Sequence, residues 1–226
     1  MHDNLNLVHS NTIVSIASKS IFIFTSMIFA ALSLVFLASC DDEPTDNDIN
    51  HMQIWPMEVG NFWVYQSATI LEDSILGYDT VKFVVSGKVS ISGSEWFLMG
   101  GEGKPKKEMY INKPDGLWKD KYDSGMTVNT QDIRMILKYP TKTGDKIFWK
   151  DETTETVAKN IPVSTPAGNF KCLHYLNRAY REIDLYFCPG IGMISQKFIT
   201  MISHYPPNPK LDTIWIEMKL LDYNVK

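Results

Sequence analysis

The sequence lacks the motifs by which many enzymes are recognised. It contains no Gly-x-Ser-x-Gly elbow, phosphate-binding loop, dinucleotide fingerprint, His-Glu-x-x-His or Cys-x-x-Cys motif. Dispersed carboxylates such as Asp120, Asp123 and Glu182 are more simply interpreted as a solvated strand face. We therefore predict a protein that is not an enzyme and that needs no cofactor.

Histidine, cysteine and excess basic charge are also scarce. The 226 residues include 5 histidines and 3 cysteines, and the formal net charge is −4. No basic stripe is present, so nucleic acid is not expected as a partner. Cys172 and His174 together with Cys188 would supply three zinc ligands but not a fourth, so no metal site is predicted.

Charge is absent altogether from one stretch near the N-terminus. From Ile21 to Ala38 every residue is uncharged, and the only cation before this run is Lys19. A cation followed by an apolar run and small residues is typical of a secretory signal. The run ends in Leu37-Ala38-Ser39-Cys40, which resembles the lipobox of bacterial lipoproteins. This resemblance implies that the Cys40 thiol receives a diacylglycerol and that the peptide bond before Cys40 is then cut.

The alternative for this stretch is a plain transmembrane anchor with a chance cysteine. A helix stop should be followed by cations, whereas Asp41–Asp48 contains five acidic residues in this sequence, Asp41, Asp42, Glu43, Asp46 and Asp48. This segment has no apolar periodicity and is predicted to be a solvated tether. It also resembles the acidic export signal of surface lipoproteins of the Bacteroidota, which implies an outer-membrane, surface-exposed location. The Asp next to the cysteine would instead suggest the inner membrane under enterobacterial sorting rules.

The predicted organisation is therefore a cleaved signal peptide, a short anchor and one domain. The expected ranges are 1–39 for the signal peptide, 40–54 for the lipidated cysteine with its acidic tether, and 55–226 for a single β domain. Alternating apolar and polar residues separated by turn residues recur along this domain, without a convincing helical period. We predict an all-β, mainly antiparallel meander that forms an open or closed β-barrel with few or no helices. The strands are expected at 62–70, 80–91, 96–99, 108–112, 117–122, 126–139, 154–163, 170–176, 183–187, 192–200 and 211–223. For 126–139 a helix is the alternative, because Ile133, Ile136 and Leu137 would share one helical face.

The two cysteines that follow Cys40 lie in a predicted hairpin. Cys172 and Cys188 are equidistant from Tyr180, so a turn centred there places them opposite each other. In an exported protein such a pair is a disulfide candidate. The same register pairs His174 with Tyr186 and assigns the core to the face opposite the cysteines. Two free thiols are the alternative.

Three segments of the β domain carry a family resemblance. They are Trp55–Tyr65, Val163–Cys172 and Tyr186–Ile194, each built around glycine-containing turn signatures. In this order they resemble uncharacterised secreted β proteins and lipoproteins, including the DUF3108-like group. Those proteins are similar to the LolA/LolB-like half-barrels that carry lipid or lipoprotein. The resemblance implies a fold and assigns no ligand-binding residue.

Three roles remain open for the domain. The first is an envelope lipoprotein that binds an apolar ligand or a protein partner without catalysis. The second is a glycan-binding surface lipoprotein, for which Trp118 is the candidate because it follows the Pro114-Asp115-Gly116 turn and is expected to be exposed. The third is a purely structural envelope module. Trp63, Trp96, Trp149 and Trp215 lie within strand patterns and are predicted to be core residues.

Overall fold

A computed structural model describes residues 53–104, 106–122, 132–179, 182–204 and 211–226. By its internal contacts the chain divides into Met1–Thr45, which lies outside the described residues, and Asp46–Lys226. No helix in the described ranges is long and apolar enough to cross a membrane. The second unit contains all the strands described: β1 (Phe62–Leu71), β2 (Ser74–Ile91), β3 (Ser94–Gly101), β4 (Lys107–Lys113), β5 (Gly116–Tyr122), β6 (Arg134–Lys138), β7 (Lys146–Trp149), β8 (Glu152–Thr165), β9 (Gly168–Arg178), β10 (Glu182–Cys188), β11 (Gly192–His204) and β12 (Leu211–Asn224).

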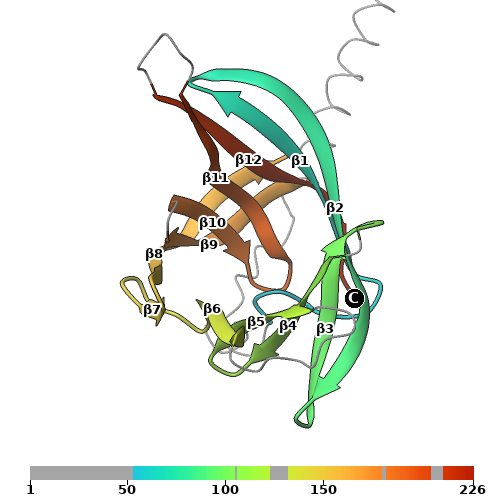
Figure 1. The fold of residues 1–226 in the computed structure, drawn as a ribbon. Coiled ribbons are helices and arrows are strands. Elements are labelled where there is room, and N and C mark those ends of the chain that lie inside the picture. The colour runs from blue at the N-terminus through green and yellow to red at the C-terminus, as the bar shows by residue number, and fades with distance from the viewer. Residues whose placement is uncertain (1–52, 105, 123–131, 180–181, 205–210) are drawn as a thin grey trace, which may run out of the picture. The chain divides into compact units, whose positions relative to one another are not determined.

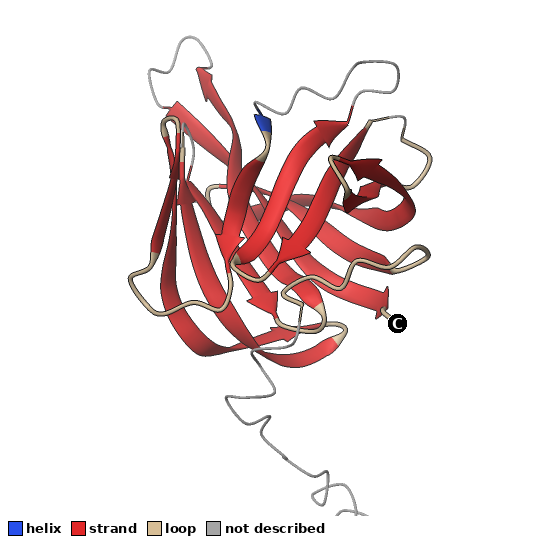
Figure 2. Ribbon diagram, turned by 90° about the horizontal axis from the view of Figure 1, so that it is seen from below, coloured by secondary structure: helices blue, strands red, loops and turns tan. Residues whose placement is uncertain are grey.

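These strands form one 12-stranded antiparallel sheet in the order β6-β5-β4-β3-β2-β1-β12-β11-β10-β9-β8-β7. Strands that are neighbours in the sheet are also neighbours in sequence, except that β1 pairs with β12 at the centre. The consecutive strands β6 and β7 do not pair and form the two ends of the sheet. The sheet curls until these two ends approach each other, which makes a nearly closed barrel (Figures 1 and 2). The predicted all-β meander is confirmed.

Local sequence explains most of the strands. In β1, the alternating residues Trp63 and Tyr65 are fully buried while their neighbours are half-buried, as expected for a strand with one face against a core. The Pro114-Asp115 turn joins β4 to β5 with Lys113 opposite Gly116, as predicted. The strand predicted at Met126–Tyr139 is shorter than expected in its described part, because only Arg134–Lys138 forms β6 and residues 123–131 lie outside the described ranges.

The register predicted for the cysteine hairpin is confirmed. His174 lies opposite Tyr186, and their rings stack at 4.5 Å. Leu173 and Phe187 form the next pair, and both are buried, as the predicted core face requires.

The prediction that Cys172 faces away from the core is wrong, because Cys172 is 1% exposed and belongs to the buried cluster. Both faces of β9 are covered at this point. The turn between β8 and β9 lies against β12, where the amide of Ala167 donates to the carbonyl of Leu220 at 3.2 Å. Phe170, two residues before Cys172, also contacts Tyr223 of β12.

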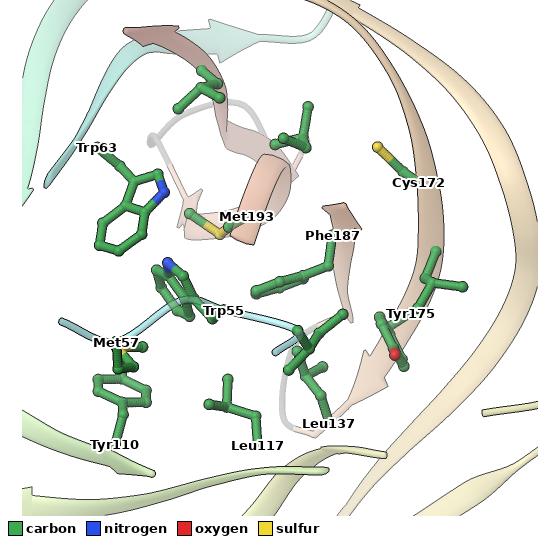
Figure 3. Packing of buried hydrophobic residues seen from close by; sticks show 14 of the residues in the cluster. Trp55, Met57, Trp63, Tyr110, Leu117, Leu137, Cys172, Tyr175, Phe187 and Met193 are labelled. Atoms are coloured by element: carbon green, nitrogen blue, oxygen red, sulfur yellow. The ribbon is translucent and has the colours of Figure 1, made fainter. Parts of the chain in front are cut away.

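The segment before β1 closes one part of the barrel interior. Trp55 lies among rings and aliphatic side chains from several strands (Figure 3). Its ring centroid is 5.5 Å from that of Trp63, 5.6 Å from that of Tyr110 and 5.4 Å from that of Phe187. Ile54 is also buried, so the packed residues begin one position before the predicted domain start. The whole buried cluster lies between Ile54 and Val225, which gives this unit a core of its own.

Candidate functional site

A cavity of about 480 Å³ remains inside the barrel beside Trp55. Its apolar wall comes from strands that are far apart in sequence, and the residues that form it are Trp55, Phe83, Met99, Ile136, Leu137, Ile147, Ile183, Leu185, Phe187 and Met193. Ile183, Leu185 and Phe187 are alternate residues of β10 that point to the same side of the sheet. Trp55 comes from the segment before β1, so strand alternation accounts for only part of the wall. The interior is therefore not completely filled by its own side chains.

Two ion pairs form a polar part of the same cavity. The Lys119 ammonium lies 2.7 Å from a Glu108 carboxylate oxygen, and Arg134 lies 3.3 Å from Glu152. The Arg134 guanidinium also lies 4.0 Å from the ring centroid of Trp149, which suits a cation–π contact. A smaller hollow of about 210 Å³ shares all of these residues, so the polar part continues into it.

Glu108 is held in its charged form. Burial raises the pKa of this carboxyl, but the positive charge of Lys119 and hydrogen bonds from Lys119 and Tyr110 outweigh burial, so its pKa lies below the ordinary value. The Tyr110 hydroxyl donates to Glu108 at 2.6 Å. Burial, and then the charge of Glu108, raise the pKa of Tyr110 well above its ordinary value. Tyr110 is therefore a fixed hydrogen-bond donor at neutral pH.

The polar part stands where the two ends of the sheet meet. Arg134 belongs to β6, Trp149 ends β7, and Glu152 begins β8. Further along the same junction, Lys138 of β6 pairs with Asp145 at 3.0 Å, and its carbonyl accepts a hydrogen bond from the Tyr175 hydroxyl at 2.9 Å. In the described residues no ladder of backbone hydrogen bonds joins β6 to β7, so side chains bridge this junction.

The cavity combines an apolar wall with polar groups at its border. Its apolar wall can cover a hydrocarbon or ring system, while the ion pairs, Asn177 and Thr154 present donors and acceptors at its border. Asn177 and Thr154 are hydrogen-bonded to each other at 2.8 Å. Among the residues described, no group of three His, Cys, Asp or Glu side chains is placed to hold a metal ion.

Trp118, the predicted glycan-binding residue, is not part of the cavity lining. It is half-buried rather than exposed, so the expected exposure is wrong. Its indole N–H donates to Asp115 at 2.9 Å, and the Lys113 ammonium lies 4.2 Å from a ring centroid of Trp118. A sugar would have to compete with Lys113 for a ring face.

The candidate disulfide residues also lie outside the cavity lining. Cys172 and Cys188 are both free thiols in the structure. Burial, with a smaller effect of Cys188, raises the pKa of Cys172 to about 12, and burial raises the pKa of Cys188 to about 11. Protonated thiols are poor nucleophiles. The bridge between them stays a prediction.

Sequence reasoning placed Asp120 on a solvated strand face, which is wrong, because Asp120 is 3% exposed and lines the smaller hollow. It missed the other polar residues of the cavity. Trp149 was predicted to be core, but it is half-buried at the cavity border. Glu108 and Tyr110 alternate in β4, which is the available signal, yet Met109 between them is fully buried. Because both faces of β4 are covered, the alternation of apolar and polar residues in its sequence did not show which side chains point into the barrel. The partners Arg134 and Glu152 meet only through closure of the sheet.

Comparison with known proteins leaves the chain without an assigned family. No family model matches the sequence, and no curated protein matches it. One similar solved structure, from Bacteroides fragilis, is described as an exported protein with a YmcC-like fold; it has 12% identity and a TM-score of 0.37. Another, from Parabacteroides distasonis, is described as a lipoprotein; it has 10% identity and a TM-score of 0.35. Each alignment covers 76% of this chain and 99% of the other. The DUF3108-like and LolA/LolB-like resemblance stays an expectation.

Proposed function

We propose that this protein is a lipid-anchored envelope protein whose barrel binds one small amphipathic molecule without chemically changing it. The observation that carries the proposal is the cavity of about 480 Å³ inside the barrel. Small-molecule sites occupy roughly 300–1,000 Å³ and are mostly apolar with a few polar groups. The apolar part of the ligand would lie against Trp55, Leu137 and Leu185, and its polar part would lie near Arg134 and Glu152.

The polar group of this ligand is expected to be uncharged or zwitterionic. Lys119 is already paired with Glu108 and Arg134 with Glu152. The third cation of the lining, Lys106, is exposed, so water screens its charge. A ligand with a single net charge would have to break one of these pairs or leave its own charge poorly compensated. A group with both donors and acceptors could bind without that cost.

The sequence supports an envelope location through Cys40 and its lipobox-like context. Two or more acyl chains hold a protein durably at a bilayer, since each buried methylene contributes about 0.8 kcal/mol. The acidic residues after Cys40 favour the outer membrane and exposure at the surface.

An apolar naphthalene fluorophore tests the proposal. A secreted form that starts at Asp41 retains the whole buried cluster and avoids competition from detergent. We expect saturable binding at a single site with enhanced emission. Leu185→Trp, which adds bulk to the cavity wall, should weaken binding by about tenfold, equivalent to about 1.4 kcal/mol.

A matched variant controls for the substitution itself. Leu221→Trp introduces the same side chain at an exposed position of β12, since Leu221 is 39% exposed and outside the cavity lining. It should leave fluorophore binding unchanged. Absence of saturable uptake, or an equal loss in both variants, would reject the binding function.

A further inference from the structure

Two hairpins extend the sheet beyond the rest of the barrel as a projecting arm. The arm consists of the adjacent strands β2, β1, β12 and β11, and it reaches the upper left of Figure 1. β3 pairs with β2 only from Phe83 onwards, and β10 pairs with β11 only up to Phe198. The first half of β2, Ser74–Val81, therefore has β1 on one side and no strand of the described chain on the other.

The free edge of β2 is unusually apolar. Ile75 is 52% exposed, Leu76 58% and Tyr78 62%. Most proteins protect such an edge with lysine, proline or a covering segment. Neither lysine nor proline occurs between Ser74 and Val81. An exposed apolar edge of this kind is a template for pairing with another strand.

The register continues this apolar surface across the arm. Ile75 lies opposite Ile70, Ile70 lies opposite Trp215, and Trp215 lies opposite Ile199. Paired residues project from the same face of a sheet. One row of apolar side chains thus crosses all four strands of the arm and ends at the free edge.

Charge selects among the partners that could cover this edge. Glu72 and Asp73 form the turn at the tip of the arm, Asp79 lies further along β2 opposite Ser67, and no cation occurs from Leu71 to Val81. An anionic bilayer surface would repel these carboxylates. Antiparallel pairing of two copies would join two segments that carry carboxylates and no cation, so no ion pair could form between them in any register. Pairing centred on Leu76 would also place Asp73 of one copy opposite Asp79 of the other, and like charges directly opposite each other are destabilising.

We propose that the free edge of β2, from Ser74 to Val81, binds an extended segment of another protein as an added strand. Main-chain hydrogen bonds supply affinity in this mode, and alternate side chains supply specificity. The segment that fits carries apolar residues at alternate positions, which continue the row that ends at Ile75, and lysine or arginine beside Asp73 and Asp79. This surface lies outside the cavity lining, so it does not depend on ligand binding.

A synthetic peptide tests the proposal on the mature acylated protein, reconstituted into vesicles of phosphatidylcholine, whose zwitterionic surface does not attract a cationic peptide. A short labelled peptide of alternating valine and lysine should bind saturably, more weakly as salt is raised. Its binding should slow hydrogen exchange of amides within residues 74–81. The same peptide N-methylated at every second residue lacks the necessary donors and should not bind.

Two variants separate edge pairing from general stickiness. Leu76→Lys places a cation on the exposed edge and should weaken peptide binding by about tenfold. Phe148→Lys removes a side chain that is 74% exposed in β7 and should leave binding unchanged. Equal affinity in both variants overturns the proposal. Protection of residues 74–81 by the vesicles alone, or by raised protein concentration alone, overturns it in favour of a membrane or of a second copy.

Discussion

At the scale of single residues, contact between Trp55 and Gly192 holds the segment before β1 in the barrel. A Cβ added at Gly192 would lie 2.3 Å from Cδ1 of Trp55, and Gly192 has a φ of +108°. We predict that Gly192→Ala lowers the free energy of unfolding by about 3 kcal/mol, because overpacking adds to backbone strain. Denaturant unfolding followed by tryptophan fluorescence measures this change.

Gly93→Ala provides the matched control. Gly93 also has a positive φ, +79°, but a Cβ there meets nothing within 4 Å. Gly93→Ala should lower the free energy of unfolding by only about 1 kcal/mol, because the left-handed backbone conformation is its only source of strain. Equal losses in the two variants would contradict the proposed contact with Trp55.

The buried thiols predict a loss of stability at alkaline pH. Cys172 has an ordinary pKa of 9.0 that burial, followed by the charge of Cys188, raises to about 12 in the folded protein. As pH rises, the thiol of Cys172 therefore loses its proton in the unfolded chain before it does so in the folded protein. The stability that the buried thiol contributes is complete below pH 9 and is lost as pH rises towards 12. We expect the free energy of unfolding to fall above about pH 9, and to fall less steeply in Cys172→Ala.

Counting thiols in denaturant without reductant must accompany this titration. If two thiols react, not counting Cys40, then Cys172 and Cys188 are free, as in the structure. If no thiol other than Cys40 reacts, the predicted disulfide is present. With free thiols, identical alkaline slopes in the wild type and in Cys172→Ala would show that another group is responsible. The buried tyrosines are the first to consider, since the pKa of Tyr139 is raised to about 12 mainly by burial.

At the scale of elements, side-chain bridges replace a strand ladder between β6 and β7. Arg134 and Glu152 are 22% and 32% exposed, so their ion pair should contribute less than about 1 kcal/mol to stability. We predict that Glu152→Gln changes the free energy of unfolding by less than that amount. It should nevertheless speed release of the bound fluorophore several-fold, because one bridge beside the cavity is lost. Stopped-flow dilution measures the release rate.

Glu95→Gln is the corresponding control. Glu95 pairs with Lys88 at 3.0 Å in the β2–β3 hairpin, away from the cavity lining. Glu95→Gln should leave both the free energy of unfolding and the rate of fluorophore release nearly unchanged. If both variants release the fluorophore at the wild-type rate, the β6–β7 junction is not the barrier that retains the ligand.

The elements that sequence predicted well are those set by neighbours in the chain. The Pro114-Asp115 turn fixed the β4–β5 register, and symmetry about Tyr180 fixed that of β9 and β10. The ion pair of Arg134 with Glu152 depends instead on how far the sheet curls, which local patterns do not specify. The same limit applies to Cys172, which belongs to the buried cluster although local alternation assigned it to the face away from the core.

At the scale of the whole molecule, the anchor should keep the barrel close to a bilayer. Asp41–Met52 provides 12 residues before the described domain, and these span at most about 40 Å when fully extended. Ligand uptake by the cavity and strand pairing by the arm would both then occur near the membrane surface. This proximity depends on acylation of Cys40.

We predict that radiolabelled palmitate enters the wild-type protein but not Cys40→Ala. Uncleaved Cys40→Ala could stay at the inner membrane through the apolar run from Ile21 to Ala38, so molecular mass must be measured together with fractionation. The lipoprotein pathway predicts that the variant accumulates at precursor mass and is lost from the outer membrane. A plain transmembrane anchor predicts the same mass and the same location for both proteins. The second result would show that Cys40 carries no lipid anchor, while the proposals for the cavity and the free edge of β2 would still be tested independently.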